Sequence, residues 1–278
     1  MKKIQVLILT MILLIACSSY AIKVKLTGKS VTQTLQIDGN YTEIDVSRAI
    51  NVFMSDTVSM AYVEADEALI QYFQYKIKGN CLVFTMRENI SLESSDNKKS
   101  SIKVYLPFKD GIKDIKLSGA SSFVCGNPLS VDDLSIELTG ASYLKGDIIS
   151  KSIIANISGA SKHYGYVEAR KLIMNFSGAS KYDGTLNSDD ASISVSGASD
   201  IRFDGIVEQL RLKLSGASHL EGRQITDLNA DISGASHADV DCSGTIKCKA
   251  SGASKLIYSG NASIEDIDSS GASVVRRK

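Results

Sequence analysis

Apolar and polar positions alternate along the C-terminal two-thirds of the chain, in a pattern that returns about every 19 residues. Each unit is centred on the Gly of a Ser-Gly-Ala-Ser or Thr-Gly-Ala-Ser tetrapeptide. The nine glycines are Gly119, Gly140, Gly159, Gly178, Gly197, Gly216, Gly234, Gly252 and Gly271. Positions two and four before the Gly, and four after it, are mostly apolar, with polar residues between them. This alternation predicts two short strands per unit, each with one buried side, joined at a Gly-Ala corner.

Equal units with the same corner favour coils that stack, because one coil cannot bury its own apolar side. We therefore predict an all-β protein, a right-handed single-stranded parallel β-helix (β-solenoid). It has about nine regular coils of ~19 residues, preceded by irregular N-terminal coils that form a cap. A strand-plus-helix repeat is disfavoured because the second half of each unit lacks a 3.6-residue period. A meander of antiparallel hairpins remains the alternative.

The break in the repeat divides the chain into three parts: a leader over residues 1–21, an irregular β head over 22–112, and the repeat solenoid over 113–278. In the head, short alternating runs predict strands, and residues 67–75 predict one or two helical turns. A solenoid needs a cap because its terminal strands otherwise expose open hydrogen-bonding edges. We expect the head to be that cap, continuous with the coils, and the basic end Arg276-Arg277-Lys278 to shield the last edge.

The first residues have the pattern of an export signal. Two lysines precede an apolar run from Ile4 to Ala16, which is too short to cross a bilayer. The run Leu14-Ile15-Ala16-Cys17 resembles the lipobox of bacterial lipoproteins, so we favour cleavage before Cys17 and lipidation of that residue. Cleavage after Ser19-Tyr20-Ala21 is the alternative. Either way we expect an exported protein of a Gram-negative bacterium, in the outer membrane, in the periplasm or on the cell surface.

The overall charge of the chain bears on which classes of macromolecule it can bind. The chain has 31 basic and 31 acidic residues, and no stretch concentrates the basic ones. Nucleic-acid binding depends on clustered Lys and Arg, so we expect no nucleic-acid partner. Contact with a membrane is expected only through a lipid anchor.

Candidate chemistry is sparse, and we expect no catalytic residue and no cofactor. One group stands out, because the alignment of the coils places His219 beside His237, flanked by Glu221 and Asp239. Imidazoles and carboxylates at that separation could bind a divalent metal. We favour the alternative interpretation, in which these side chains form a ladder of polar groups exposed to solvent. His163 falls in an inward column and is expected to be a satisfied core residue.

The remaining cysteines and the repeated serines also have structural explanations. Cys81, Cys125, Cys242 and Cys248 match no metal or redox spacing, and we expect buried thiols rather than a disulfide. The small residues of the corner suit a tight turn, and stacked Ser hydroxyls can bond along the ladder.

The sequence resembles the exported bacterial proteins known as putative auto-transporter adhesins with a head GIN domain. The motifs that carry the resemblance are the leader, Arg48-Ala49-Ile50-Asn51-Val52, Val63-Glu64-Ala65-Asp66, Leu82-Val83-Phe84, Ile102-Lys103-Val104-Tyr105-Leu106-Pro107 and Ser118-Gly119-Ala120-Ser121. Ala49 stands where the family name suggests Gly. The resemblance implies a parallel β-helix without the catalytic residues of pectin-lyase-like solenoids, and a role in adhesion.

The function expected from these features is non-catalytic: a cell-envelope or cell-surface adhesin that binds a glycan or a protein along the solenoid face. A carbohydrate-active enzyme of the lyase or hydrolase kind, an ice-binding protein and a purely structural envelope protein are the alternatives. Ice binding is disfavoured because it needs outward ranks of Thr, which is scarce in this chain.

Overall fold

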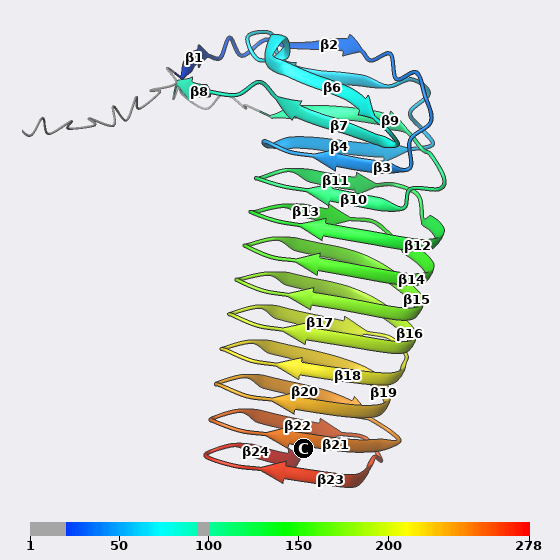
Figure 1. The fold of residues 1–278 in the computed structure, drawn as a ribbon, viewed down its shortest axis with the longest axis vertical. Coiled ribbons are helices and arrows are strands. Elements are labelled where there is room, and N and C mark those ends of the chain that lie inside the picture. The colour runs from blue at the N-terminus through cyan, green and yellow to red at the C-terminus, as the bar shows by residue number, and fades with distance from the viewer. Residues whose placement is uncertain (1–20, 94–100) are drawn as a thin grey trace, which may run out of the picture.

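The computed structural model describes residues 21–93 and 101–278 and shows a β-solenoid (Figure 1). The fold class is confirmed, with about nine turns whose corners are the nine repeat tetrapeptides. The leader and Cys17 lie outside the described residues. No helix in the described part of the chain is long and apolar enough to cross a membrane.

Each coil has two sides, which we name by their relation to the Gly-Ala corner. The strands that run up to the corner form the leading face, and those that leave it form the trailing face. The leading face consists of β3 (Glu43–Val46), β10 (Asp114–Leu117), β12 (Leu129–Leu138), β14 (Ile148–Ile157), β18 (Val207–Leu214), β21 (Thr245–Ala250), β23 (Ser263–Ser269) and the second halves of β15 (Lys162–Phe176), β16 (Lys181–Val195) and β19 (His219–Ile232). The trailing face consists of the first halves of β15, β16 and β19 with β4 (Ile50–Ser55), β11 (Ser122–Cys125), β13 (Tyr143–Lys145), β17 (Asp200–Asp204), β20 (His237–Cys242), β22 (Lys255–Ser259) and β24 (Val274–Arg277).

Neighbouring coils pair in parallel and in register, as the repeat predicts. Between β15 and β16, for example, Met174 lies opposite Ile193 and Phe176 opposite Val195. The inward columns fill one continuous core, in which Phe123 and Leu220 are fully buried. Antiparallel pairing occurs among the described strands only in the head, so the hairpin meander is wrong for the repeat region.

The head closes the N-terminal end of the solenoid. It contains β1 (Ile22–Lys25), β2 (Ser30–Thr34), β5 (Tyr62–Asp66), the 3₁₀ turn η1 (Ile70–Tyr72), β6 (Phe73–Lys78), β7 (Cys81–Met86), β8 (Ile90–Glu93) and β9 (Ile102–Pro107). Strand β6 adds antiparallel to β7, and β5 and then β2 add antiparallel beyond β9. The predicted helical turns are the single turn η1.

The coils of the head are not stacked in sequence order. Strands β3 and β4 lie between two other coils: β7 and β9 pair on one side of them, and β10 and β11 on the other. The chain therefore completes its outer coil before it returns to start the regular repeat against β3 and β4. At the β3–β4 corner, Arg48 and Ala49 both have φ +62°, where every repeat corner has Gly.

A buried carboxylate ties the first strand segment to the head. Asp66 accepts hydrogen bonds from the backbone N–H groups of Thr27 (3.1 Å), Gly28 (2.7 Å) and Ala68 (2.9 Å). Burial opposes ionisation of this carboxyl, but these donors outweigh it and lower its pKa. The sequence pattern gave no sign of this role.

Candidate ligand-binding surface

The Gly-Ala corners form a continuous ladder whose geometry requires glycine. Each corner Gly has a φ near +74°, and at Gly178 an added Cβ would lie 2.5 Å from the carbonyl oxygen of Gly159. The same carbonyl accepts the N–H of Ala179 at 2.7 Å, which holds the two coils together at the corner. A side chain would therefore be strained in its backbone conformation and would also break the ladder.

Many serine hydroxyls of the corners bond to the backbone, whereas that of Ser121 is buried without a partner among the described residues. The second Ser of the tetrapeptide points inward and donates to the carbonyl of the first residue in the same tetrapeptide, as Ser180 does to Ser177 at 2.7 Å. The first Ser reaches the preceding coil instead, as Ser196 does to the carbonyl of Phe176 at 3.2 Å. The second Ser also bonds along the ladder, as Ser254 does to the carbonyl of Ile232 on the preceding coil at 3.2 Å, so both serines connect neighbouring coils.

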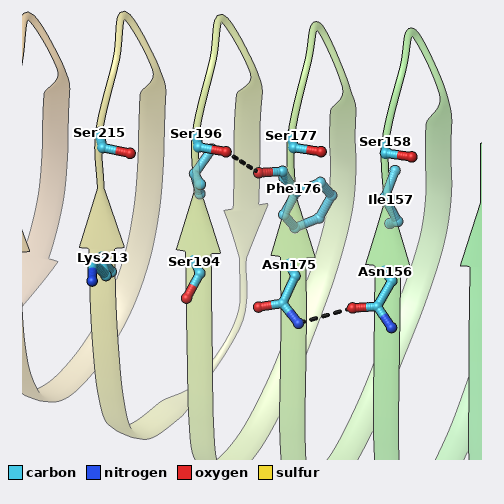
Figure 2. A pocket seen from close by; sticks show the side chains of 11 residues that line it. Asn156, Ile157, Ser158, Asn175, Phe176, Ser177, Ser194, Ser196, Lys213 and Ser215 are labelled. Carbon is cyan, nitrogen blue, oxygen red and sulfur yellow. Dashed lines mark hydrogen bonds between the residues drawn. The ribbon is translucent and has the colours of Figure 1, made fainter.

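A shallow groove of about 440 Å³ runs along the leading face beside the corners (Figure 2). Strands β14, β15, β16 and β18 each contribute to it. Its lining residues are Asn156, Ile157, Ser158, Asn175, Phe176, Ser177, Ser194, Val195, Ser196, Lys213 and Ser215. Figure 2 shows two parallel rows on this surface, one of amide and hydroxyl side chains ending at Lys213 and one of corner serines.

The outer row of the groove is uncharged over three coils. Asn175 donates to Asn156 through the side-chain amides at 2.9 Å, and Ser194 follows on the next coil. In the six remaining repeat coils the same column carries Lys, Glu or Asp. Ile154 lies two residues before Asn156 on the same side and is 47% exposed. The surface thus combines neutral hydrogen-bonding groups with an exposed apolar side chain.

Over the coils that line the groove, the trailing face instead carries charged side chains, several of them in ion pairs. The ion pairs there include Lys181 with Asp183 and Arg202 with Asp200. A ligand would have to compete with these pairs for each charged group. The groove on the leading face is therefore the better candidate for recognition of a neutral ligand.

The four candidate metal ligands do come together on adjacent coils. His219 and His237 stack with ring centroids 5.2 Å apart, and the carboxylates of Glu221 and Asp239 lie one coil apart. Arg223 forms an ion pair with both carboxylates. The described residues contain no group of three or more side chains placed to hold a metal ion.

Arg223 is the residue that the sequence analysis missed at this cluster. It lies where the register between β19 and β20 shifts between Gly222 and Ile225, so the repeat alignment does not place it. Asp239 also pairs with Lys278 at 2.9 Å. Burial raises the pKa of Asp239, but Lys278 and Arg223 outweigh it and hold that pKa below its usual value.

The four described cysteines are free thiols, as expected. Cys125, Cys242 and Cys248 are buried, and Cys81 is half-buried. Burial raises the pKa of Cys242 and of Cys248 to about 11. These thiols are protonated and enclosed, so they resemble small core side chains rather than reactive groups.

His163 occupies the inward column as predicted, but it is not satisfied. Among the described residues neither of its ring nitrogens has a hydrogen-bond partner, and the side chain is fully buried. Burial alone lowers its pKa to about 4, so the ring is neutral at ordinary pH. The expectation of a satisfied histidine was wrong because His163 lies in its column between Leu144, which is apolar, and Tyr182, whose hydroxyl donates to the backbone instead.

A parallel stack of equal coils with an irregular N-terminal head defines a β-solenoid repeat protein. The chain belongs to the family described as "Putative auto-transporter adhesin, head GIN domain", whose sequence model matches residues 40–185 and 163–262. The description of that family points to an exported or surface protein.

Solved structures share this fold. A putative adhesin from Parabacteroides merdae is 19% identical, with a TM-score of 0.56 over 92% of this chain and 99% of that one. A putative adhesin from Parabacteroides distasonis is 17% identical, with a TM-score of 0.58 over 92% and 100%. A putative lipid binding protein from the same organism is 16% identical, with a TM-score of 0.59 over 92% and 100%. No curated protein matches the sequence.

Proposed function

We propose that this protein is a non-catalytic adhesin of the cell envelope that binds a glycan in the groove on its leading face. The observation that carries the proposal is the uncharged row of Asn156, Asn175 and Ser194 beside the corner serines. Family membership supports the adhesive role in general. The chemistry of the groove supports a glycan as the class of ligand.

The chemistry of the groove suits a sugar chain. Side-chain amides offer both a donor and an acceptor, and hydroxyls do the same, so they can match sugar hydroxyls in either sense. The exposed side chain of Ile154 offers contact to the apolar face of a sugar ring. Repetition across adjacent coils lets a long glycan gain affinity from several weak contacts. A protein ligand is the second candidate for this surface.

A carbohydrate-active enzyme would need an acid and a base that converge on one bond. In the cluster richest in such groups, Glu221 and Asp239 are both held by Arg223, which favours a structural role for them. Turnover of any polysaccharide that is lost when Glu221 or Asp239 is replaced would replace the adhesin proposal with an enzymatic one.

The test uses residues 21–278, which contain every described strand. We expect the protein to bind members of a glycan array, and the double substitution N156A/N175A to weaken binding to the best glycan at least tenfold by calorimetry. Lys162→Ala is the control, because Lys162 is exposed at the other end of β15 on the trailing face. Equal weakening by the control, or binding only to matrix proteins, would contradict the glycan groove.

The site of attachment is part of the proposal. We propose that Cys17 becomes the lipidated N-terminus and anchors the protein in the outer membrane of a Gram-negative bacterium. Metabolic labelling with a fatty-acid analogue should mark the wild-type protein and leave a Cys17→Ala variant unlabelled. Labelling of neither, with a mature N-terminus after Ala21, would support the freely released form instead.

A further inference from the structure

The row of neutral side chains in the groove ends at a cation. Asn156, Asn175 and Ser194 lie in register on adjacent coils. Lys213 follows Ser194 in the same column on β18. Of the described residues that line the groove, Lys213 is the only charged one. Figure 2 shows its side chain in line with the row, so a ligand that follows the row meets one positive charge at this end.

The charge of Lys213 is available to a ligand. Its side chain is exposed, and it forms no ion pair within the described part of the chain. Asp231 is the next residue of the column and lies in register with Lys213, but the two do not form an ion pair. The neighbouring cation, Arg211, is held by Asp190. Lys213 is therefore the cation that a ligand in the groove can pair with.

The opposite end of the row carries the opposite charge. Glu137 precedes Asn156 in the same column, and its side chain is exposed. Four coil steps of about 4.8 Å separate Glu137 from Lys213, roughly 19 Å in all, which exceeds the Debye length of about 8 Å at physiological salt. Neither charge therefore compensates the other. An acidic group on a ligand is attracted at the β18 end and repelled at the β12 end.

Building on the glycan groove proposed above, we infer that its ligand carries a single acidic sugar, which lies over β18 with its carboxylate beside Lys213. The acidic sugar rests on the proposed function, because it presupposes a glycan in the groove. Neutral sugars of the same chain cover the amides and the hydroxyl of the row, which match sugar hydroxyls.

The neutral row also disfavours a glycan with an acid on every sugar. Carboxylates over Asn156, Asn175 and Ser194 would lose water without gaining a positive partner. The carboxylate furthest from Lys213 would approach Glu137. The charges thus select both the number of acidic sugars and the direction in which the chain lies.

The test compares glycans that differ only in charge. Residues 21–278 are titrated by calorimetry with oligosaccharides that end in one sialic or uronic acid, and with the methyl esters of the same carboxyls. We expect each acid to bind about fivefold more tightly than its ester, because an exposed ion pair is worth about that factor. The difference should shrink at high salt. Polygalacturonate fragments, acidic at every sugar, should bind more weakly than the singly acidic chains.

Substitutions at Lys213 link the preference to this residue. Lys213→Gln should make each acid bind as its ester does, and Lys213→Glu should make the ester the better ligand. Lys249→Gln is the matched control, because Lys249 is exposed in the same column two coils further on and does not line the groove. It should leave the fivefold preference intact.

The other outcomes separate this inference from the glycan groove itself. Equal binding of acids and esters, both weakened by N156A/N175A, would overturn the acidic sugar and leave the groove standing. A preference for acids that survives Lys213→Gln, or tighter binding of polygalacturonate, would also overturn it. Binding to no glycan at all, by protein with a native circular-dichroism spectrum, would overturn the proposed function and this inference together.

Discussion

The rings of His163 and Tyr182 form a T-shaped contact inside the solenoid, with ring centroids 5.3 Å apart. The two side chains occupy the same inward column on adjacent coils. The hydroxyl of Tyr182 donates to the backbone, with the carbonyl oxygens of Gly165 and Thr185 at 3.2 and 3.0 Å, so its polar end is satisfied. His163 has no such partner, so both of its ring nitrogens are buried without a hydrogen bond among the described residues, which is unfavourable.

Replacing His163 with Leu should stabilise the protein at neutral pH by about 1–2 kcal/mol, because it removes two buried nitrogens that lack partners. The difference should grow in acid. The pKa of His163 falls from 6.5 to about 4 on folding, so the unfolded chain binds the proton first. Relative to the variant, wild-type stability is therefore lost as pH falls from about 6.5 to about 4, by about 3 kcal/mol in all.

Urea unfolding of both proteins across that pH range measures this difference. Because the other titrating groups are common to both, the difference isolates His163. A difference that stays constant with pH would mean that His163 keeps its ordinary pKa in the folded protein.

Gly178→Ala should destabilise the solenoid by about 3 kcal/mol or more, since it combines a positive φ with a clash against the carbonyl of Gly159. Thermal unfolding followed by circular dichroism measures the loss. Ala179→Gly is the matched control, because that methyl group is exposed, and it should cost no more than about 1 kcal/mol. Similar losses for the two variants would contradict the glycine ladder.

Arg223→Ala should lower the free energy of unfolding by about 1 kcal/mol, because it removes two partly exposed ion pairs and leaves Glu221 near Asp239. The loss should shrink at high salt, since exposed charges are screened. Arg170→Ala, at an exposed position on β15, should have little effect at either ionic strength. A loss that does not depend on salt would indicate that Arg223 stabilises through packing of its aliphatic stem.

Cys242 and Cys248 should resist a thiol reagent in the folded protein at pH 8, because both are buried and their pKa values are raised to about 11. Full reaction should follow only after unfolding in urea. The melting temperature should not change with added reductant. A melting temperature that falls under reducing conditions would reveal a disulfide and contradict the free thiols.

The regular coils could be predicted from the sequence because every contact there repeats a local pattern. Alternation fixed the inward columns, including the unusual members His163 and Tyr182, and the recurrent Gly marked each corner. Arg223 escaped prediction because one coil is shorter than its predecessor and the register shifts at Gly222. The repeat alignment assigns side chains at such irregular positions to no column, so their neighbours could not be predicted from the sequence.

The head was harder because its pairings are long-range. The alternation of apolar and polar residues in β3 and β4 does not indicate that β9 pairs on one side of this coil and β11 on the other. The positive φ of Arg48 and Ala49 was also hidden, since a corner without Gly gives no local signal. The groove needed the structure as well, because it depends on which outward side chains are neutral on adjacent coils.

The identical corners have an evolutionary consequence. Because each coil contacts only its neighbours, duplicating or deleting one 19-residue unit leaves every remaining corner unchanged and moves the last coil relative to the head by about 4.8 Å. Related chains can therefore vary the length of their solenoid in small steps, by copying a stretch of gene, without having to evolve a new core.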